Sequence, residues 1–109
     1  MPRYVRPLAG GDLEAVIEVL GNRVRVAILG YLRHRGPSTR KEIVDGLAVS
    51  TPTITDHLRV LVEHEAIVTD PPLELRKRGQ AVTYDINPPV VDRFYAELGQ
   101  AIGAGDKSS

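Results

Sequence analysis

The chain has 109 residues, of which 42% are hydrophobic and only five are aromatic, so it fits one compact domain with an aliphatic core and is too apolar for a disordered chain. It has no cysteine, which excludes disulfides and thiolate metal sites, and no apolar run approaches the roughly 18–20 residues of a membrane helix or forms a signal-peptide core, so we expect a cytoplasmic protein. The 14 basic and 14 acidic residues cancel, but residues 21–80 hold ten Lys/Arg against seven Asp/Glu, so positive charge is concentrated there.

Two amphipathic helices are predicted first. Asp12 is a candidate cap for a helix over 13–20, and Asn22 for a helix over 23–35 that ends at Gly36-Pro37. The first helix has one apolar face, formed by Leu13, Val16, Ile17 and Leu20. The second has a predicted buried stripe of Val24, Ala27, Ile28, Tyr31 and Leu32, with Arg23, Arg25, Arg33 and Arg35 reaching water.

Two further helices follow with a very short turn between them. Ser38 or Thr39 caps the third helix, and Glu42 is placed for a capping box if the cap is Thr39. Ala48-Val49 forms the turn, and Ser50 is the expected cap of the fourth helix. The expected core residues of the pair are Ile43, Val44, Leu47, Ile54, Leu58, Leu61 and Val62. This spacing predicts a helix-turn-helix.

A hairpin and a last helix complete the prediction. Strands are expected at 67–70 and 81–86, joined by residues 71–80, and a helix over 90–102 follows. One side of that helix carries Val91, Phe94, Tyr95, Leu98 and Ile102. The predicted fold is mainly α with a small β-hairpin: a winged helix-turn-helix with N- and C-terminal flanking helices.

The domain is expected to span residues 12–102. Residues 1–11 are rich in proline and glycine, and residues 103–109 are mainly glycine, serine and lysine. Both segments are predicted to be flexible tails.

Polar and basic residues gather where such a domain touches DNA. The candidate contacts are Arg40 and Lys41 for the backbone, Ser50, Thr51, Thr53, Thr55 and Arg59 for the recognition helix, and Arg76, Lys77 and Arg78 at the wing tip. Threonine can bond phosphates or base edges, and arginine can pair with guanine or with phosphate. A wing arginine is also suited to the negative potential of the minor groove.

Purely structural explanations for these residues also remain open beside DNA binding. The threonine-rich stretch can be a solvated helix face, although threonine is a poor helix former, and the basic run can be an ordinary hairpin tip. Asp56 would repel phosphate, so it accepts from a cytosine amino group, faces away, or pairs with Arg59, which we favour. The zero net charge and Asp56 also keep a different class of function in view, a winged-helix module that binds a protein.

No residue pattern predicts an enzyme, a metal site or a cofactor. His57 and His64 are two helical turns apart, about 10 Å, too far to share a metal ion. Ser50 has no neighbouring base to activate it, and Gly10-Gly11 does not follow a strand as a phosphate loop would.

Residues 20–29 (LGNRVRVAIL) resemble the second-helix signature of the arsenical-resistance-repressor (ArsR) family. Residues 47–61 (LAVSTPTITDHLRVL) resemble its turn and recognition helix, and Gly79 with Val82-Thr83-Tyr84 resembles its wing, so the likeness covers roughly residues 13–100. It implies a double-stranded DNA partner, repression of a nearby operon, and release by an inducer.

The resemblance also implies a homodimer formed mainly by the first and last helices. Its interface would be Leu13, Val16, Ile17, Leu20, Phe94, Tyr95, Leu98 and Ile102, although about half of these can equally complete a monomer core. Metal sensors of the family use cysteines near the recognition helix or Asp/His pairs on the last helix. This chain has no cysteine and no histidine in its last helix, so those metal sites do not carry over.

Overall fold

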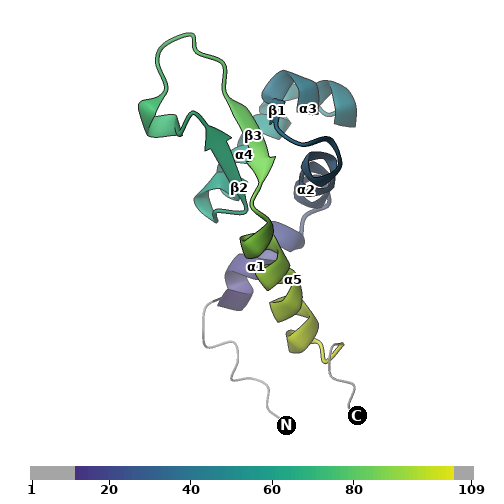
Figure 1. Ribbon diagram of the computed structural model, residues 1–109. Helices are drawn as coiled ribbons and strands as arrows, with labels where there is room; N and C mark the ends of the chain where they lie inside the picture. The colour runs from purple at the N-terminus through teal and green to yellow at the C-terminus, as the bar shows by residue number, and fades with distance from the viewer. Residues whose placement is uncertain (1–11, 105–109) are drawn as a thin grey trace.

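The computed structural model describes residues 12–104. They form five α-helices, α1 (Asp12–Leu20), α2 (Arg23–Arg35), α3 (Arg40–Leu47), α4 (Thr51–Glu63) and α5 (Pro88–Ala101). Three short strands, β1 (Ser38–Thr39), β2 (Ile67–Asp70) and β3 (Thr83–Ile86), and a 3-10 turn η2 (Leu73–Leu75) complete the order. The predicted winged helix-turn-helix is therefore confirmed (Figure 1).

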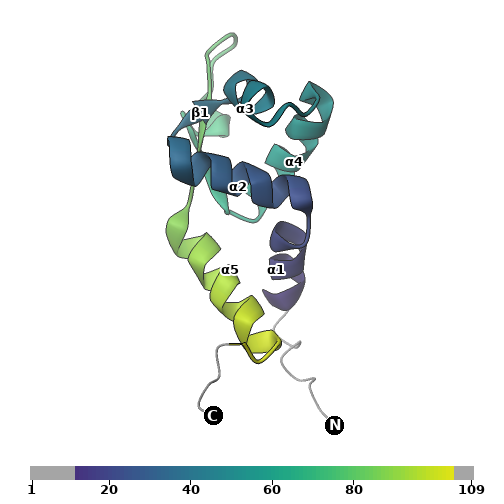
Figure 2. The same ribbon diagram turned by 90° about the vertical axis from the view of Figure 1, so that its right-hand side faces the viewer.

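Different secondary-structure elements lie at the two ends of the molecule. Helices α1 and α5 pack together at one end, and α3, the start of α4 and the loop between β2 and β3 lie at the other (Figures 1 and 2). Helix α2 lies between them and touches α1, α3, α4 and β3. The predicted tail 1–11 and residues 105–109 of the predicted tail 103–109 lie outside the described residues. Gly103 and Ala104 are described, and their backbone N–H groups donate to the carbonyls of Gln100 and Gly99. Asp12 was predicted to cap the first helix from outside, but it is the first residue of α1.

The starts of α2 and α3 follow local side-chain chemistry, and the start of α4 does not. The Asn22 carboxamide oxygen accepts from the backbone N–H groups of Val24 and Arg25, at 2.9 and 3.1 Å. Thr39 and Glu42 form the predicted capping box, in which each side chain accepts from the other's backbone N–H. Ser50 stands at the cap position of α4 as predicted but makes no capping bond; its hydroxyl donates to the Thr53 hydroxyl at 2.9 Å.

The sheet has three strands where the sequence predicted two. β3 lies in the middle, antiparallel to β2 and to β1, with Ser38 opposite Tyr84 and Thr39 opposite Thr83. β3 begins at Thr83 rather than at residue 81, since its last partner on β2 is Asp70 and the prolines that follow have no N–H to donate. Helix α5 also begins earlier than predicted, with Pro88 and Pro89 in its first turn.

The core is aliphatic apart from Phe94. Its buried members are Val16, Val19, Ile28, Leu29, Leu32, Ile43, Ile54, Leu58, Leu61, Ala66, Ile67, Ile86, Val91 and Phe94. Two predicted faces are corrected: Ala27 and Ile17 are exposed, and Leu29 and Val19 are buried in their place. Helices α1 and α2 each pack against more than one neighbouring element. Their buried surfaces are therefore wider than the single predicted face and are rotated about the helix axis relative to it.

One glycine is required by close packing between α2 and α3. A Cβ added at Gly46 would overlap the Tyr31 ring and stand 2.9 Å from its Cζ atom. Moving the Tyr31 ring aside would cost free energy, because its hydroxyl donates to the Glu42 carbonyl and Arg35 stacks over it at 5.5 Å.

We therefore expect Gly46→Ala to lower the free energy of unfolding by about 1–3 kcal/mol in urea denaturation, as an overpacking substitution does. Gly30 on α2 is the matched control, since a Cβ there meets nothing within 4 Å. Gly30→Ala should raise stability by about 0.5–1 kcal/mol through helix propensity. Equal effects of the two alanines would contradict the close approach at Gly46.

No helix within residues 12–104 has the length and apolar character needed to cross a membrane.

Candidate nucleic-acid interface

A groove lies between the starts of α3 and α4 and the β2–β3 loop, which we call the wing. Its volume is about 580 Å³. Its lining includes Arg40, Lys41 and Thr51 from the helices and Arg76 from the wing. Two consecutive helices and the wing, which comes later in the sequence, thus bring four of the predicted DNA contacts around one concave surface.

A second, smaller depression of about 290 Å³ adjoins it along α4. Arg40 lines both the groove and this depression. In the depression it lies beside Thr55 and Arg59, which are one helical turn apart on α4. The guanidinium of Arg40 donates to the Thr55 hydroxyl at 3.4 Å, which ties the start of α3 to the exposed face of α4. Leu73 and Tyr84 separate the two depressions, because both residues line each of them.

The remaining predicted contacts stand apart from these depressions. Ser50 and Thr53 are at the N-terminus of α4 and bond to each other at 2.9 Å. Lys77 and Arg78 are exposed at the wing turn, where Gly79 has φ +77°. The Gln80 side chain accepts from the Lys77 N–H, and its carbonyl accepts from the Arg76 guanidinium, so the turn is ordered by its own polar groups.

Charge at the helix starts favours an anionic partner. Arg40 and Lys41 occupy the first two positions of α3, where the helix dipole is positive and repels cations. Helix α4 has no acidic residue in its first turn and no side chain capping its N–H groups. A phosphate at this surface would satisfy both the arginine and lysine charges and the unbonded N–H groups.

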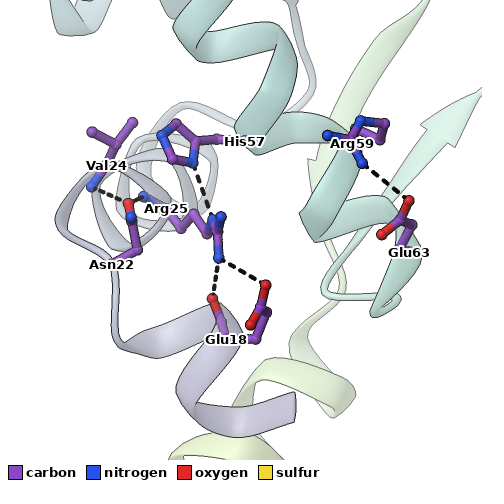
Figure 3. A network of polar contacts seen from close by, with 7 residues as sticks. All are labelled: Glu18, Asn22, Val24, Arg25, His57, Arg59 and Glu63. Carbon is purple, nitrogen blue, oxygen red and sulfur yellow. Dashed lines mark hydrogen bonds and ion pairs between the residues drawn. The ribbon is translucent and has the colours of Figure 1, made fainter. Parts of the chain in front are cut away.

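Two of the basic side chains already have acidic partners. Lys41 pairs with Asp45 at 3.0 Å and Arg59 with Glu63 at 3.3 Å, each across one helical turn. Both pairs are exposed and therefore weak, so a phosphate can replace the carboxylate at little cost. The predicted pair of Arg59 with Asp56 is wrong: the longer Glu63 side chain, four residues on, reaches the guanidinium (Figure 3).

The residues predicted for a dimer interface divide into three groups. Val16 and Phe94 are buried in the core of the chain itself, Leu13, Leu20 and Leu98 are half-buried, and Ile17, Tyr95 and Ile102 are exposed. Ile17 lies on α1, Tyr95 in the middle of α5 and Ile102 just beyond the end of α5. The two helices pack together at the end of the molecule away from the wing (Figure 2).

Sequence reasoning missed the contacts of Arg25 and His57. Arg25 was expected to reach water, but its side chain is only 16% exposed and its Nε donates to His57 Nδ1 at 3.0 Å. The sequence placed Arg25 on the second predicted helix and His57 on the fourth, and nothing local indicated that the two side chains meet. Within residues 12–104 no group of three or more His, Asp or Glu side chains is arranged to hold a metal ion.

Comparison with known proteins identifies the fold. Residues 20–70 match the model of a helix-turn-helix domain. The structure is similar to an ArsR-like transcriptional regulator from Rhodococcus sp. RHA1, with 23% identity, 88% and 83% of the two chains covered and a TM-score of 0.66. No curated protein sequence matches the chain.

Two other solved structures have the same fold. A homodimeric winged helix-turn-helix DNA-binding domain from Mycobacterium bovis, described as a possible ArsR-family regulator, is 20% identical over 98% of this chain and 93% of that one, with a TM-score of 0.63. An antimony-specific transcriptional repressor is 16% identical over 97% and 91%, with a TM-score of 0.64. The chain thus has an ArsR-like winged helix-turn-helix fold.

Proposed function

We propose that this chain is a transcriptional regulator of the ArsR family that binds double-stranded DNA as a homodimer and acts as a repressor. The observation that carries the proposal is the groove where Arg40, Lys41, Thr51 and Arg76 converge from α3, α4 and the wing. A recognition helix in the major groove with a basic wing beside it requires this arrangement.

The proposed complex places α4 in the major groove. Thr51, Thr55 and Arg59 point from its exposed face, while Ile54, Leu58 and Leu61 hold the opposite face in the core. The wing residues Arg76, Lys77 and Arg78 would lie on the flanking backbone or in the minor groove. In a homodimer the two α4 helices would enter successive major grooves about 34 Å apart, on an inverted repeat.

Selection from genomic DNA tests this proposal. The purified protein is incubated with sheared DNA of its source organism at low salt, and the bound fragments are recovered and sequenced. Enrichment of one or a few inverted repeats is the expected result, and a reporter gene behind such a repeat then tests repression. A folded sample that enriches nothing above background would favour the alternative, a winged-helix module that binds a protein.

Arg59 is the residue best placed to read a base from α4. Arg59→Ala is expected to weaken binding to the selected repeat by about 1–3 kcal/mol and to relax the preference at one base pair. Glu63→Gln is the matched control, because it removes the carboxylate that holds Arg59 and should leave affinity unchanged or higher. Both are measured by fluorescence anisotropy on the repeat and its single-base variants, and an unchanged affinity in Arg59→Ala would remove this residue from the interface.

A further inference from the structure

Arg25 links three helices through one side chain. It projects from α2 into the junction of α1 and α4 (Figure 3). Its Nε donates to His57 Nδ1 on α4 at 3.0 Å, and its Nη1 donates to the Glu18 carbonyl on α1 at 2.5 Å and lies 3.6 Å from the Glu18 carboxylate. The guanidinium therefore spans from the helix at the α1–α5 end of the molecule to the helix that carries Thr55 and Arg59.

The bond to His57 requires a neutral imidazole. Nδ1 accepts only when it carries a lone pair, so the ring proton must sit on Nε2. A doubly protonated ring would turn a donor and a positive charge toward the guanidinium. Burial of the ring, reinforced by the Arg25 charge, lowers the pKa of His57 from its ordinary value of 6.5, and Asp56 opposes part of this shift.

The groups around His57 leave no other partner for this nitrogen among the described contacts. Arg25 faces it from α2, and Asp56 is its neighbour on α4. Glu18 on α1 acts on the ring only through Arg25, whose charge it partly balances. Helix α4 is otherwise held by its buried apolar face, so it should stay folded when the Arg25 bond is lost.

We propose that Arg25 is a positioning residue which holds the recognition helix in its DNA-binding position through neutral His57, and that protonation of His57 releases the helix and weakens DNA binding at acidic pH. This inference rests on the proposed DNA-binding function. It also implies that the position of α1 is communicated to α4, because the same guanidinium binds Glu18.

The proposal predicts an unusual sign for the pH dependence. Protonating a histidine ordinarily strengthens binding to a polyanion by adding positive charge. Here the neutral ring is required, so DNA affinity is full above about pH 6.5 and declines as the pH falls through the lowered pKa of His57. The decline follows the protonated fraction of His57, and its total size is at least the loss expected when the Arg25 bond is absent, because the charged ring also repels the guanidinium.

Four variants separate this role from general stability. His57→Asn keeps an acceptor at the position of Nδ1 but does not titrate, so it should bind DNA as the wild type does at neutral pH and lose the acidic decline. Arg25→Met keeps the apolar stem and removes the donor, so affinity should fall about three- to tenfold at neutral pH. Glu18→Gln keeps the carbonyl that Arg25 binds and should change little. His64→Asn, at the end of the same helix, is the control and should keep the wild-type profile.

Affinity is measured by fluorescence anisotropy from about pH 5 to about pH 8, with circular dichroism at each pH to confirm that the protein stays folded. In parallel, NMR of the free protein follows the His57 ring. The expected result is the Nε2–H tautomer with a low pKa that rises in Arg25→Met. An acidic decline that persists in His57→Asn, or a His57 pKa unaffected by Arg25→Met, would overturn the proposal.

The NMR measurement keeps the two proposals distinguishable. A wild-type protein that binds no DNA at any pH would contradict the proposed function, and a low His57 pKa that depends on Arg25 would still establish the bond between α2 and α4. Conversely, pH-independent DNA binding by the wild type would support the function and contradict the positioning role.

Discussion

Replacing Arg76, Lys77 and Arg78 together with alanine is expected to weaken DNA binding by about 100-fold at physiological salt. Each phosphate contact contributes about 0.9 to the slope of log affinity against log salt, so three lost contacts should reduce that slope by up to about 2.7. The wing residues are exposed, so the thermal unfolding midpoint should change little.

The control for this experiment removes charge from helices outside the proposed DNA-binding surface. Arg33 and Arg93 are exposed arginines on α2 and α5, each in an ion pair with an acidic neighbour. Their double alanine variant should leave the salt slope nearly unchanged. Anisotropy titrations at several salt concentrations give both quantities, and equal slopes for the wing variant and the wild type would show that the wing does not touch phosphate.

Alanine substitutions at two adjacent residues of α5 are expected to affect different properties: one the stability of the protomer, the other its dimerisation. Phe94 is 4% exposed and belongs to the core, so Phe94→Ala should lower the free energy of unfolding by about 3–5 kcal/mol. Tyr95 is 74% exposed, so Tyr95→Ala should leave the stability of the protomer within about 0.5 kcal/mol. If Tyr95 anchors the proposed homodimer, its loss should weaken dimerisation about 30-fold, as for an aromatic hot spot.

Urea denaturation and analytical ultracentrifugation distinguish these effects. Ile102→Ala is a companion to Tyr95→Ala, since Ile102 is also exposed, next to the end of α5. A dimerisation constant unchanged in both variants would exclude this surface from the interface. A Phe94→Ala protein as stable as the wild type would contradict the packing of α5 against the core.

Helix starts and the order of elements could be predicted because they depend on neighbours in the chain. Asn22 bonds to N–H groups two and three residues on, and Thr39 and Glu42 bond to each other across one turn. Apolar spacing gave the buried face of α4 correctly, with Ile54, Leu58 and Leu61 in the core. The basic run at 76–78 likewise falls on the loop between two paired strands.

Pairings between distant segments were the part that the sequence left undetermined. β1 has two residues, no alternating pattern, and a partner strand more than forty residues away. The choice between Ala27 and Leu29, or Ile17 and Val19, depends on which neighbouring helices cover α2 and α1.

The sequence by itself determined the helix-turn-helix and the wing, since short-range hydrogen bonds and apolar periodicity specify them. Only the tertiary structure decided that Arg40, Thr51 and Arg76 share a groove, and that Arg25 meets His57 instead of water. The reason is physical: a guanidinium exposed on an isolated helix becomes a buried donor only when packing brings a neutral acceptor from another helix within 3.0 Å.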